Sequence, residues 1–425
     1  MLASISRRVP RHLGTISLAM VALLLGFGGL PRASAASPIN IGVMAPAAHI
    51  DGKGIINAAK LAASRINANG GIQGQPIKLY VFDDHFSASD AARAFQRAVE
   101  DDHVVAMIGI FTSEVALAME PWAGRLKTPL IVTGAVTPKL AEQVHAHYSQ
   151  LKYVFHGTVN ARELSEAACL STEATVVKPL HYTRAVIFSE NSKWTKPADA
   201  EYKKCIPKSG MKLVKTIIFS RKTSDFSPIY NEVENLHARI LMSAVAIVGE
   251  KAVVQWHQQQ VPALFAGNNG QAGATRFWDA TNGATEGVMT VNTGANGVPM
   301  TSKTPAFYHA YVKRFGVNPA FTAYPTYDTM YMLKHAIARA GTTRANALVK
   351  SIEKTNFVGV CGRIHFHGRA DKLTHGLVFS ANPKKGMALL ALQWQHGKQV
   401  VLWPKRLAQG KFEVPPFVPK PGTQD

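Results

Sequence analysis

The strongest constraint on the fold is an alternation of short apolar runs with amphipathic stretches of helical spacing. Apolar runs at 39–46 and 77–84 predict strands, and the stretches 54–69 and 88–101 predict helices. The segment 104–140 adds a third and a fourth strand with a helix between them. Strands that alternate with helices in this way predict a parallel sheet with right-handed crossovers.

The alternation starts again near residue 160. It predicts helices at 160–177, 195–209, 226–239 and 250–260, and strands at 184–190, 211–219, 244–248 and 263–267. Further helices are expected at 303–315, 324–341 and 344–354, and a hairpin within 378–404. About 390 residues follow an N-terminal leader, which is too long for one compact core. We therefore expect an α/β fold with two doubly wound, Rossmann-like lobes.

Small hydroxyl residues occur in the two turns where the third and fourth strands give way to helices. Thr112 and Ser113 are in the first turn, and Thr133 and Thr137 are in the second. Side by side on a parallel sheet, these turns would direct hydroxyls and free helix N–H groups at one point, which suits a carboxylate. The alternative for Ser113 is that it only caps a helix beginning at Glu114. Thr137 either caps a helix beginning at Pro138 instead of binding the ligand, or does both.

Residues 1–35 have the pattern of a secretory signal peptide. Arg7, Arg8 and Arg11 form a basic start, an apolar run covers 13–30, and small residues at 33–35 form a cleavage site. The alternative, a transmembrane anchor, would have a longer apolar run with a basic stop. No cysteine follows the run closely, so a lipid anchor is not expected. We expect a periplasmic or secreted product.

The charge of the chain is strongly positive, at +20. Removing the four arginines of residues 1–35 leaves 20 − 4 = +16. Such a charge makes nucleic acid a candidate partner, but the basic residues are scattered and no aromatic RNA-binding motif accompanies them. Solvated faces with a bias toward anionic ligands are the preferred interpretation, and no nucleic-acid partner is expected.

Cysteines and catalytic motifs are few. The three cysteines have no metal-ligand spacing, and a Cys169–Cys205 disulfide is plausible in an oxidising compartment, with three buried thiols as the alternative. His365 and His367 alternate on a strand without an evident third metal ligand. The chain has no nucleophile elbow, no phosphate-binding loop and no zinc motif. We expect neither an enzyme nor a cofactor or metal.

Several segments in this order resemble one protein family. The most specific are LAASRINANGGIQGQPIKL (61–79), IGIFTSEVALA (108–118) and LIVTGAVTPKL (130–140), and looser pieces are AVIFSENSKW (185–194), FAGNNG (265–270) and AYPTYD (323–328). From about 39 to 404 the chain is similar to the periplasmic substrate-binding proteins of branched-chain amino acid ABC transporters, the leucine/isoleucine/valine-binding type.

The resemblance implies a type I periplasmic binding fold with three hinge crossings. They would lie near 155–158, near 288–293 and within 366–378. The expected organisation is a signal peptide at 1–35, a first lobe of 36–156 plus 291–370, a second lobe of 157–290 plus 371–405, and a tail, 406–425, with a loose Pro-rich end.

The resemblance also implies ligand contacts. On the first lobe they are the turn of Thr112 and Ser113, which would hold a carboxylate, the Ala135 carbonyl and the Thr137 hydroxyl. On the second lobe Trp194 would close over the ligand. Further family contacts map onto Glu250 and Asn269, and Tyr324 adds one from the first lobe. The alternatives are packing for Trp194, an exposed helix acid for Glu250 and a core position for Tyr324.

One departure from the family concerns the ligand ammonium. Amino-acid binders have an acid after the strand that here is followed by Asn268, Asn269 and Gly270. An amide supplies no countercharge to a buried ammonium. Either Glu250 or Asp51 replaces the acid, or the ligand is a carboxylic acid without an amine. His49 in the altered first loop is a further candidate contact, or a solvent-facing residue.

The resemblance implies a non-enzymatic receptor. It would bind a small carboxylate-bearing ligand, either a hydrophobic amino acid or an aliphatic or aromatic acid, and deliver it as a monomer to an ABC permease. The alternatives are a periplasmic sensor for a signalling partner, and a receptor for an amide or urea-type ligand.

Overall fold

The computed structural model describes residues 37–295 and 297–421. The expected signal peptide, 1–35, lies outside the described residues. Within them, no helix has the length and the apolar character needed to span a bilayer.

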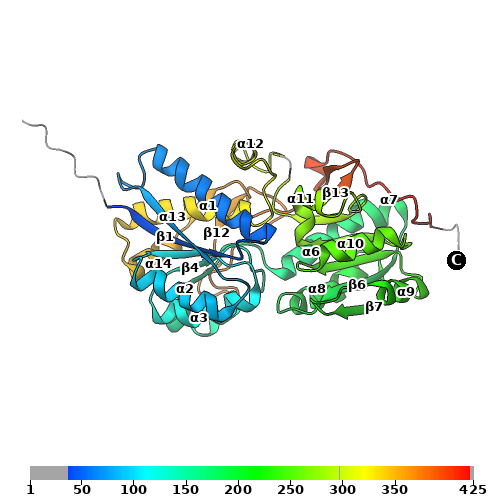
Figure 1. Cartoon of the computed structure of the whole chain (residues 1–425), viewed down its shortest axis with the longest axis horizontal. Helices are drawn as coiled ribbons and strands as arrows, with labels where there is room; N and C mark the ends of the chain where they lie inside the picture. The colour runs from blue at the N-terminus through cyan, green and yellow to red at the C-terminus, as the bar shows by residue number, and fades with distance from the viewer. Residues whose placement is uncertain (1–36, 296, 422–425) are drawn as a thin grey trace, which may run out of the picture. The chain divides into compact units, whose positions relative to one another are not determined.

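The first lobe is built on a five-stranded parallel sheet with the order β2-β1-β3-β4-β5 (Figure 1). Its strands are β1 (Ile39–Ala45), β2 (Ile77–Asp83), β3 (Ala106–Gly109), β4 (Leu130–Val132) and β5 (Val154–His156). Its helices are α1 (Ile50–Ala68), α2 (Ala88–Glu100), α3 (Ser113–Arg125), α4 (Lys139–Ala146), α5 (Tyr148–Leu151), α12 (Thr304–Phe315), α13 (Ala323–Ala340) and α14 (Ala345–Ile352). Helix α13 returns from late in the sequence to pack against α1.

The second lobe repeats the architecture with a four-stranded parallel sheet of order β7-β6-β8-β9. Its strands are β6 (Arg184–Glu190), β7 (Lys212–Phe219), β8 (Ile240–Val245) and β9 (Leu264–Asn269). Its helical segments are α6 (Ala161–Thr172), the π-helix η1 (Glu173–Val177), α7 (Lys178–Leu180), α8 (Thr195–Lys208), α9 (Ser227–Asn235), α10 (Gly249–Gln258), the 3-10 helix η2 (Gly270–Gly273) and α11 (Arg276–Ala280). The expected class, two doubly wound α/β lobes, is confirmed.

Strand β8 begins earlier than the expected 244–248. Residues 240–244 pair with β6, with Ile240 opposite Ala185 and Ala244 opposite Ser189. Residues 246–248 instead form the turn into α10. The preceding residues Ile240, Leu241 and Met242 are apolar and completely buried, so they belong to the sheet.

The third crossing between the lobes lies later than 366–378. Gly376 bridges to His156 at the edge of the first sheet, and the Leu377 N–H donates to the His156 carbonyl at 3.1 Å. The Ala388 N–H still donates to Cys361 of the first lobe, whereas Leu390 pairs with Asn292. Residues 371–388 therefore belong to the first lobe, contrary to the expected boundary at 370, because Gly376 pairs with the edge of β5 and Met387 bridges to Gly362.

A third, small sheet is antiparallel and combines a strand at the second crossing with the two strands that follow the third crossing. It has the order β10-β13-β14, with β10 (Met289–Asn292), β13 (Leu390–Gln395) and β14 (Lys398–Trp403). The expected hairpin is present but confined to 390–403. A second hairpin consists of β11 (Asn356–Val358) and β12 (Arg363–His365), and the 3-10 helix η3 (Lys405–Leu407) follows β14.

The Pro-rich end of the chain is not loose as far as residue 421. The Tyr182 hydroxyl donates to the Pro419 carbonyl at 3.0 Å, and the Phe417 ring meets the Trp256 ring edge-on at 5.1 Å between centroids. Phe412 and Val418 are buried. These apolar side chains hold the tail on the second lobe.

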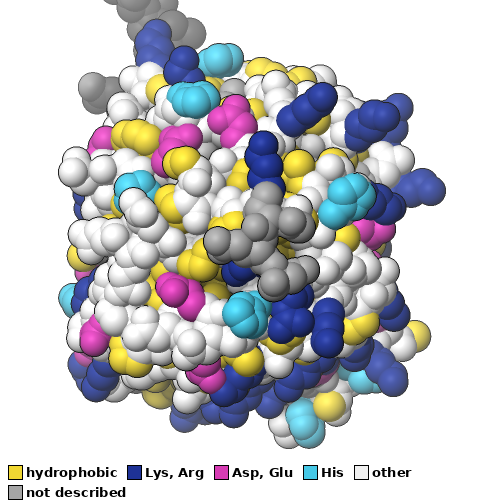
Figure 2. Space-filling view, turned by 90° about the vertical axis from the view of Figure 1, so that its right-hand side faces the viewer, with side chains coloured by type: hydrophobic (Ala, Val, Ile, Leu, Met, Phe, Trp, Pro, Cys, Tyr) yellow, Lys and Arg dark blue, Asp and Glu magenta, His cyan; other side chains and the backbone are white. Residues whose placement is uncertain are grey.

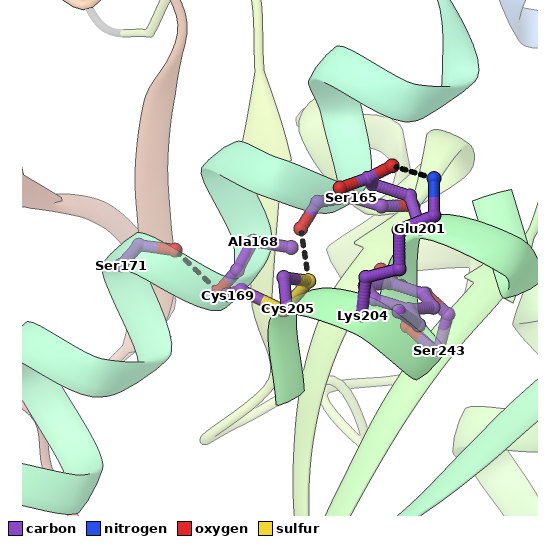
Figure 3. Close-up of a disulfide and its surroundings, with 9 residues drawn as sticks. Ser165, Ala168, Cys169, Ser171, Glu201, Lys204, Cys205 and Ser243 are labelled. Atoms are coloured by element: carbon purple, nitrogen blue, oxygen red, sulfur yellow. Dashed lines mark hydrogen bonds and ion pairs between the residues drawn. A yellow bond between two sulfur atoms is a disulfide. The ribbon is translucent and has the colours of Figure 1, made fainter. Parts of the chain in front are cut away.

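A disulfide ties α6 to α8 (Figure 3). Cys169 and Cys205 have Cα atoms 6.0 Å apart, and both helices lie beside the second sheet. Cys361 is a buried free thiol. The structure thus has the disulfide and not the alternative of three thiols.

Basic side chains are spread over the surface. On the face shown in Figure 2, Lys and Arg occupy mainly the right and lower margins, and acidic, histidine and apolar side chains lie among them.

Candidate ligand-binding site

A cavity lies at the carboxyl ends of the strands of both lobes. It holds about 570 Å³ of space, including the part that opens to solvent. Its apolar wall is formed by Phe111, Gly134, Val136, Leu164, Trp194, Val245, Ala246, Ile247, Gly270, Val291 and Phe321. Its polar wall is formed by Thr112, Ser113, Glu114, Glu190, Ser192, Arg221, Asn268, Asn292 and Thr293. The carboxyl ends of parallel strands are where open α/β sheets bind ligands.

The first hydroxyl turn faces this cavity. Helix α3 begins at Ser113, one residue earlier than expected, and Thr112 is at the N-cap position without a side-chain cap bond. The Ser113 hydroxyl is buried, with 2% of the residue exposed, and has no hydrogen-bond partner. It is therefore not used as a helix cap. The free hydroxyl and the first N–H groups of α3 are suited to an anionic oxygen.

The backbone before this turn is unusual. Gly109 has a φ of 112°, and the following Ile110 has a φ of 60°. A positive φ is costly for a β-branched residue. The Ile110 N–H nevertheless bonds to the Met44 carbonyl at 2.7 Å and its own carbonyl accepts from Ala135, so the sheet holds the bend that leads to Thr112.

The second hydroxyl turn does not present its expected groups to the cavity. Gly134 and Val136 line it, whereas Ala135 and Thr137 do not. His156 donates through Nε2 to the Ala135 carbonyl at 2.8 Å. Burial lowers the pKa of His156 to about 4, and the bond to Ala135 opposes this lowering. The Thr137 hydroxyl accepts from the Lys139 N–H at 3.4 Å, although the N-cap residue of α4 is Pro138.

On the second lobe, Trp194 lines the cavity as expected, from the turn between β6 and α8. Asn268 also lines it, but Asn269 does not. The Asn269 side chain accepts from the Gln271 N–H at 3.2 Å and lies against Gly249, where a Cβ would come within 2.4 Å of its oxygen. The bulk of Asn269 is therefore turned toward α10.

The remaining candidates lie elsewhere. Glu250 is exposed in the first turn of α10. Tyr324 is buried in the first-lobe core, with its ring 5.0 Å from that of Phe307. Asp51 is fully buried and does not line the cavity, and His49 stacks on Phe111 at 5.0 Å, behind the cavity wall. Neither Glu250 nor Asp51, the two candidates for the missing acid, lines the cavity.

Sequence reasoning missed three polar residues of the second-lobe wall: Glu190, Ser192 and Arg221. Glu190 is the last residue of β6 and is completely buried. Its Oε2 accepts from the Ile247 N–H at 3.0 Å, while Oε1 has no hydrogen-bond partner. Burial raises the pKa of Glu190, and the Ile247 bond and the nearby N–H groups of Ala246, Val248 and the Trp194 side chain oppose that rise. The signal that could have identified Glu190 from the sequence is an acid at the carboxyl end of a predicted parallel strand.

Glu114 joins the two walls of the cavity. It belongs to α3 of the first lobe, and its Oε1 accepts from the Lys193 N–H of the second lobe at 3.0 Å. The same oxygen lies 3.7 Å from Nη1 of Arg221. Arg221 therefore enters the cavity already paired, as the one cationic side chain among the described residues that line it.

Potential metal ligands gather away from this cavity. Within the described ranges, one group of three has its ligand atoms within 4.8 Å of one another: Glu286, His396 and Glu413. His396 is paired with Glu413 at 3.1 Å on the surface. The expected strand pair does not form such a group, since His367 pairs with Asp371 at 3.0 Å.

Comparisons with known proteins agree with this geometry. Residues 38–386 match the family model described as periplasmic binding protein. The Leu/Ile/Val-binding protein homolog 7 of Brucella suis is 22% identical over 422 residues, which cover 96% of this chain and 100% of that protein.

Two solved structures share the fold. One is the branched-chain amino acid transporter substrate-binding protein LivJ of Streptococcus pneumoniae in complex with isoleucine, with a TM-score of 0.71, 20% identity, and coverage of 85% of this chain and 97% of that one. The other is a solute-binding protein of Rhodopseudomonas palustris in complex with 3,4-dihydroxybenzoic acid, with a TM-score of 0.71, 20% identity, and coverage of 91% and 99%.

Proposed function

The chain belongs to the periplasmic binding protein family, as the resemblance predicted, and we propose that it is the solute receptor of an ABC transporter. It binds a small hydrophobic carboxylate between its lobes and delivers it to the permease, without chemical conversion. Family membership implies a periplasmic location. We propose that residues 1–35 direct the export and are then removed.

Ser113 carries the proposal. A buried hydroxyl without a partner is costly, and a ligand oxygen in the cavity removes that cost. The N-terminus of α3, a helix of 13 residues, supplies free N–H groups and a positive dipole end at the same place. A carboxylate fits both features better than a neutral carbonyl does. Thr112 is the neighbouring proposed contact.

The rest of the cavity suits an apolar ligand body. Phe111, Phe321 and Trp194 contribute aromatic surface, and Leu164 and Ile247 add aliphatic surface. Apolar walls with a few well-placed polar groups are typical of small-molecule sites. Isoleucine and 3,4-dihydroxybenzoic acid, found in two structures of this fold, both combine a carboxylate with an apolar body.

The contacts of Glu114 support binding by closure of the lobes. Its bonds to Lys193 and Arg221 join the first lobe to the second beside the cavity. A ligand held on the Ser113 side adds contacts to both walls and therefore stabilises the joined arrangement.

The test is a thermal-shift panel of leucine, phenylalanine, aliphatic acids, benzoates and the corresponding amides. Carboxylates should raise the melting temperature by mass action, and the amides should not. Ser113→Ala should weaken carboxylate binding by about 1–3 kcal/mol. Ser351→Ala is the matched control, since this buried hydroxyl donates to Ala336 inside the first lobe and does not line the cavity.

Two results would contradict the proposal. Stabilisation by amides but by no carboxylate would exclude an anion site. An affinity unchanged by Ser113→Ala would remove Ser113 from the ligand contacts.

A further inference from the structure

Glu190 places a carboxyl group on the second-lobe wall of the cavity whose first-lobe wall carries Ser113. One of its oxygens is held by the Ile247 N–H, and the other has no partner although the residue is completely buried. The side chain is thus fixed at one oxygen and leaves the second for another group.

The acceptors that the family resemblance implied, and the second acid on the cavity wall, are engaged or lie elsewhere. The Ala135 carbonyl accepts from His156, and the Asn269 oxygen accepts from the Gln271 N–H. Glu114, the other acid on the cavity wall, is bonded to Lys193 and lies beside Arg221. Among the described residues that line the cavity, Glu190 is the acid with a buried oxygen that has no hydrogen-bond partner.

We propose that Glu190 is the specificity-determining acceptor of this site and that the ligand carries a polar hydrogen, on an ammonium or a hydroxyl group, in addition to its carboxylate. This inference rests on the proposed function, because it assumes that a carboxylate occupies the Ser113 side. In this proposal Glu190, at the end of β6, replaces the acid that is missing after β9.

The physical reason is the cost of an unpaired buried acceptor. A ligand with a suitable donor satisfies Oε1, and an otherwise equal ligand without it leaves that oxygen unpaired in an apolar cavity. Of two ligands that differ only in this donor, the one that has the donor should therefore bind more tightly. An ammonium gains a countercharge as well, whereas a hydroxyl gains a hydrogen bond to either form of the carboxyl group.

The experiment uses two matched pairs and calorimetric titration of the mature protein. In the ammonium arm, leucine is compared with 4-methylpentanoate, which lacks only the amine. In the hydroxyl arm, 4-hydroxybenzoate is compared with benzoate. In at least one arm the donor-bearing ligand should bind about 10-fold or more tightly, and the arm that shows the preference identifies the donor.

Glu190→Gln should reduce that preference to within a few-fold, while the donor-free acid binds as well as before or better. Its amide retains an oxygen for the Ile247 N–H, so the fold tolerates the change. Asp199→Asn is the control, since Asp199 is a buried acid of the same lobe that does not line the cavity. It should leave the preference intact.

The outcomes separate the two proposals. Equal binding within both pairs, or a preference that survives Glu190→Gln, overturns the role of Glu190 and leaves the carboxylate receptor standing. If no carboxylate binds, and Ser113→Ala changes nothing, both proposals fail.

Discussion

His156, at the end of β5, donates a 2.8 Å hydrogen bond from Nε2 to the carbonyl of Ala135. The family resemblance placed that carbonyl against the ligand, but it is engaged by a ring that is itself buried. The bond links the edge strand of the first sheet to the turn beside the cavity. It occupies one lone pair of the Ala135 carbonyl and so reduces the capacity of that carbonyl to accept from a ligand ammonium.

This bond predicts an acid-sensitive contribution to stability. Burial lowers the pKa of His156 from 6.5 to about 4 in the folded protein. Between those values the unfolded chain binds the proton and the folded chain does not, so stability falls as the pH falls from 6.5 toward 4. At pH 5 the loss should be about 2 kcal/mol. Denaturant unfolding of wild type and His156→Gln at pH 7 and pH 5 measures it, and a pH-independent difference between the two would contradict it.

Glu120 predicts the opposite pH dependence. It is buried in α3 without a partner for either oxygen, and burial raises its pKa from 4.5 to about 9. The folded chain therefore keeps a proton that the unfolded chain loses, and stability falls as the pH rises from 4.5 to 9. Glu120→Gln should be stabilising, with a gain that grows by about 1.4 kcal/mol per pH unit. Thermal unfolding at pH 5.5 and 8.5 tests this, with exposed Glu166→Gln as the control. A gain equal at both pH values would exclude the burial argument.

The Cys169–Cys205 disulfide closes a sequence separation of 36 residues. Replacing both cysteines by serine should lower the free energy of unfolding by about 3–4 kcal/mol, mainly through the unfolded chain. Dithiothreitol should lower the melting temperature of wild type and not that of the variant. Under denaturing conditions, alkylation should modify one cysteine before reduction and three after it. Three modified cysteines without reduction would show that the bond does not form.

Trp194 should report ligand binding directly, because its side chain lines the cavity. A bound carboxylate should change the tryptophan fluorescence, and Trp194→Phe should abolish most of that change. Trp194→Ala should weaken binding by about 1–2 kcal/mol through lost apolar contact. Trp122→Phe is the control, since this ring packs under Arg125 at 3.8 Å and does not line the cavity. A signal that persists in Trp194→Phe would place the ligand elsewhere.

The alternation of strands and helices was readable in the sequence because each element depends on its own residues. The periodicity of residues 39–140 predicted β1 to β4 and α1 to α3 to within a few residues, whereas β5 was not predicted as a strand. Strand β8 was misplaced because an apolar run does not show where pairing begins, and its start depends on β6.

The candidate site was predictable only where it is local. The turn of Thr112 and Ser113 follows from the junction of a strand with a helix, and Trp194 follows from the family pattern. Ala135 and Thr137 also match the family pattern, but neither residue lines the cavity. The bond between Ala135 and His156 joins residues 21 positions apart, which no local pattern shows.

The sequence by itself determined the two α/β lobes, the hydroxyl turn at α3 and the absence of an acid after β9. The tertiary structure alone decided that Glu190 and Arg221 face the same cavity as Ser113, and that residues 371–388 stay with the first lobe. The physical reason is that strands and turns form from neighbouring residues, whereas a site between two lobes is formed by side chains brought together from distant parts of the chain.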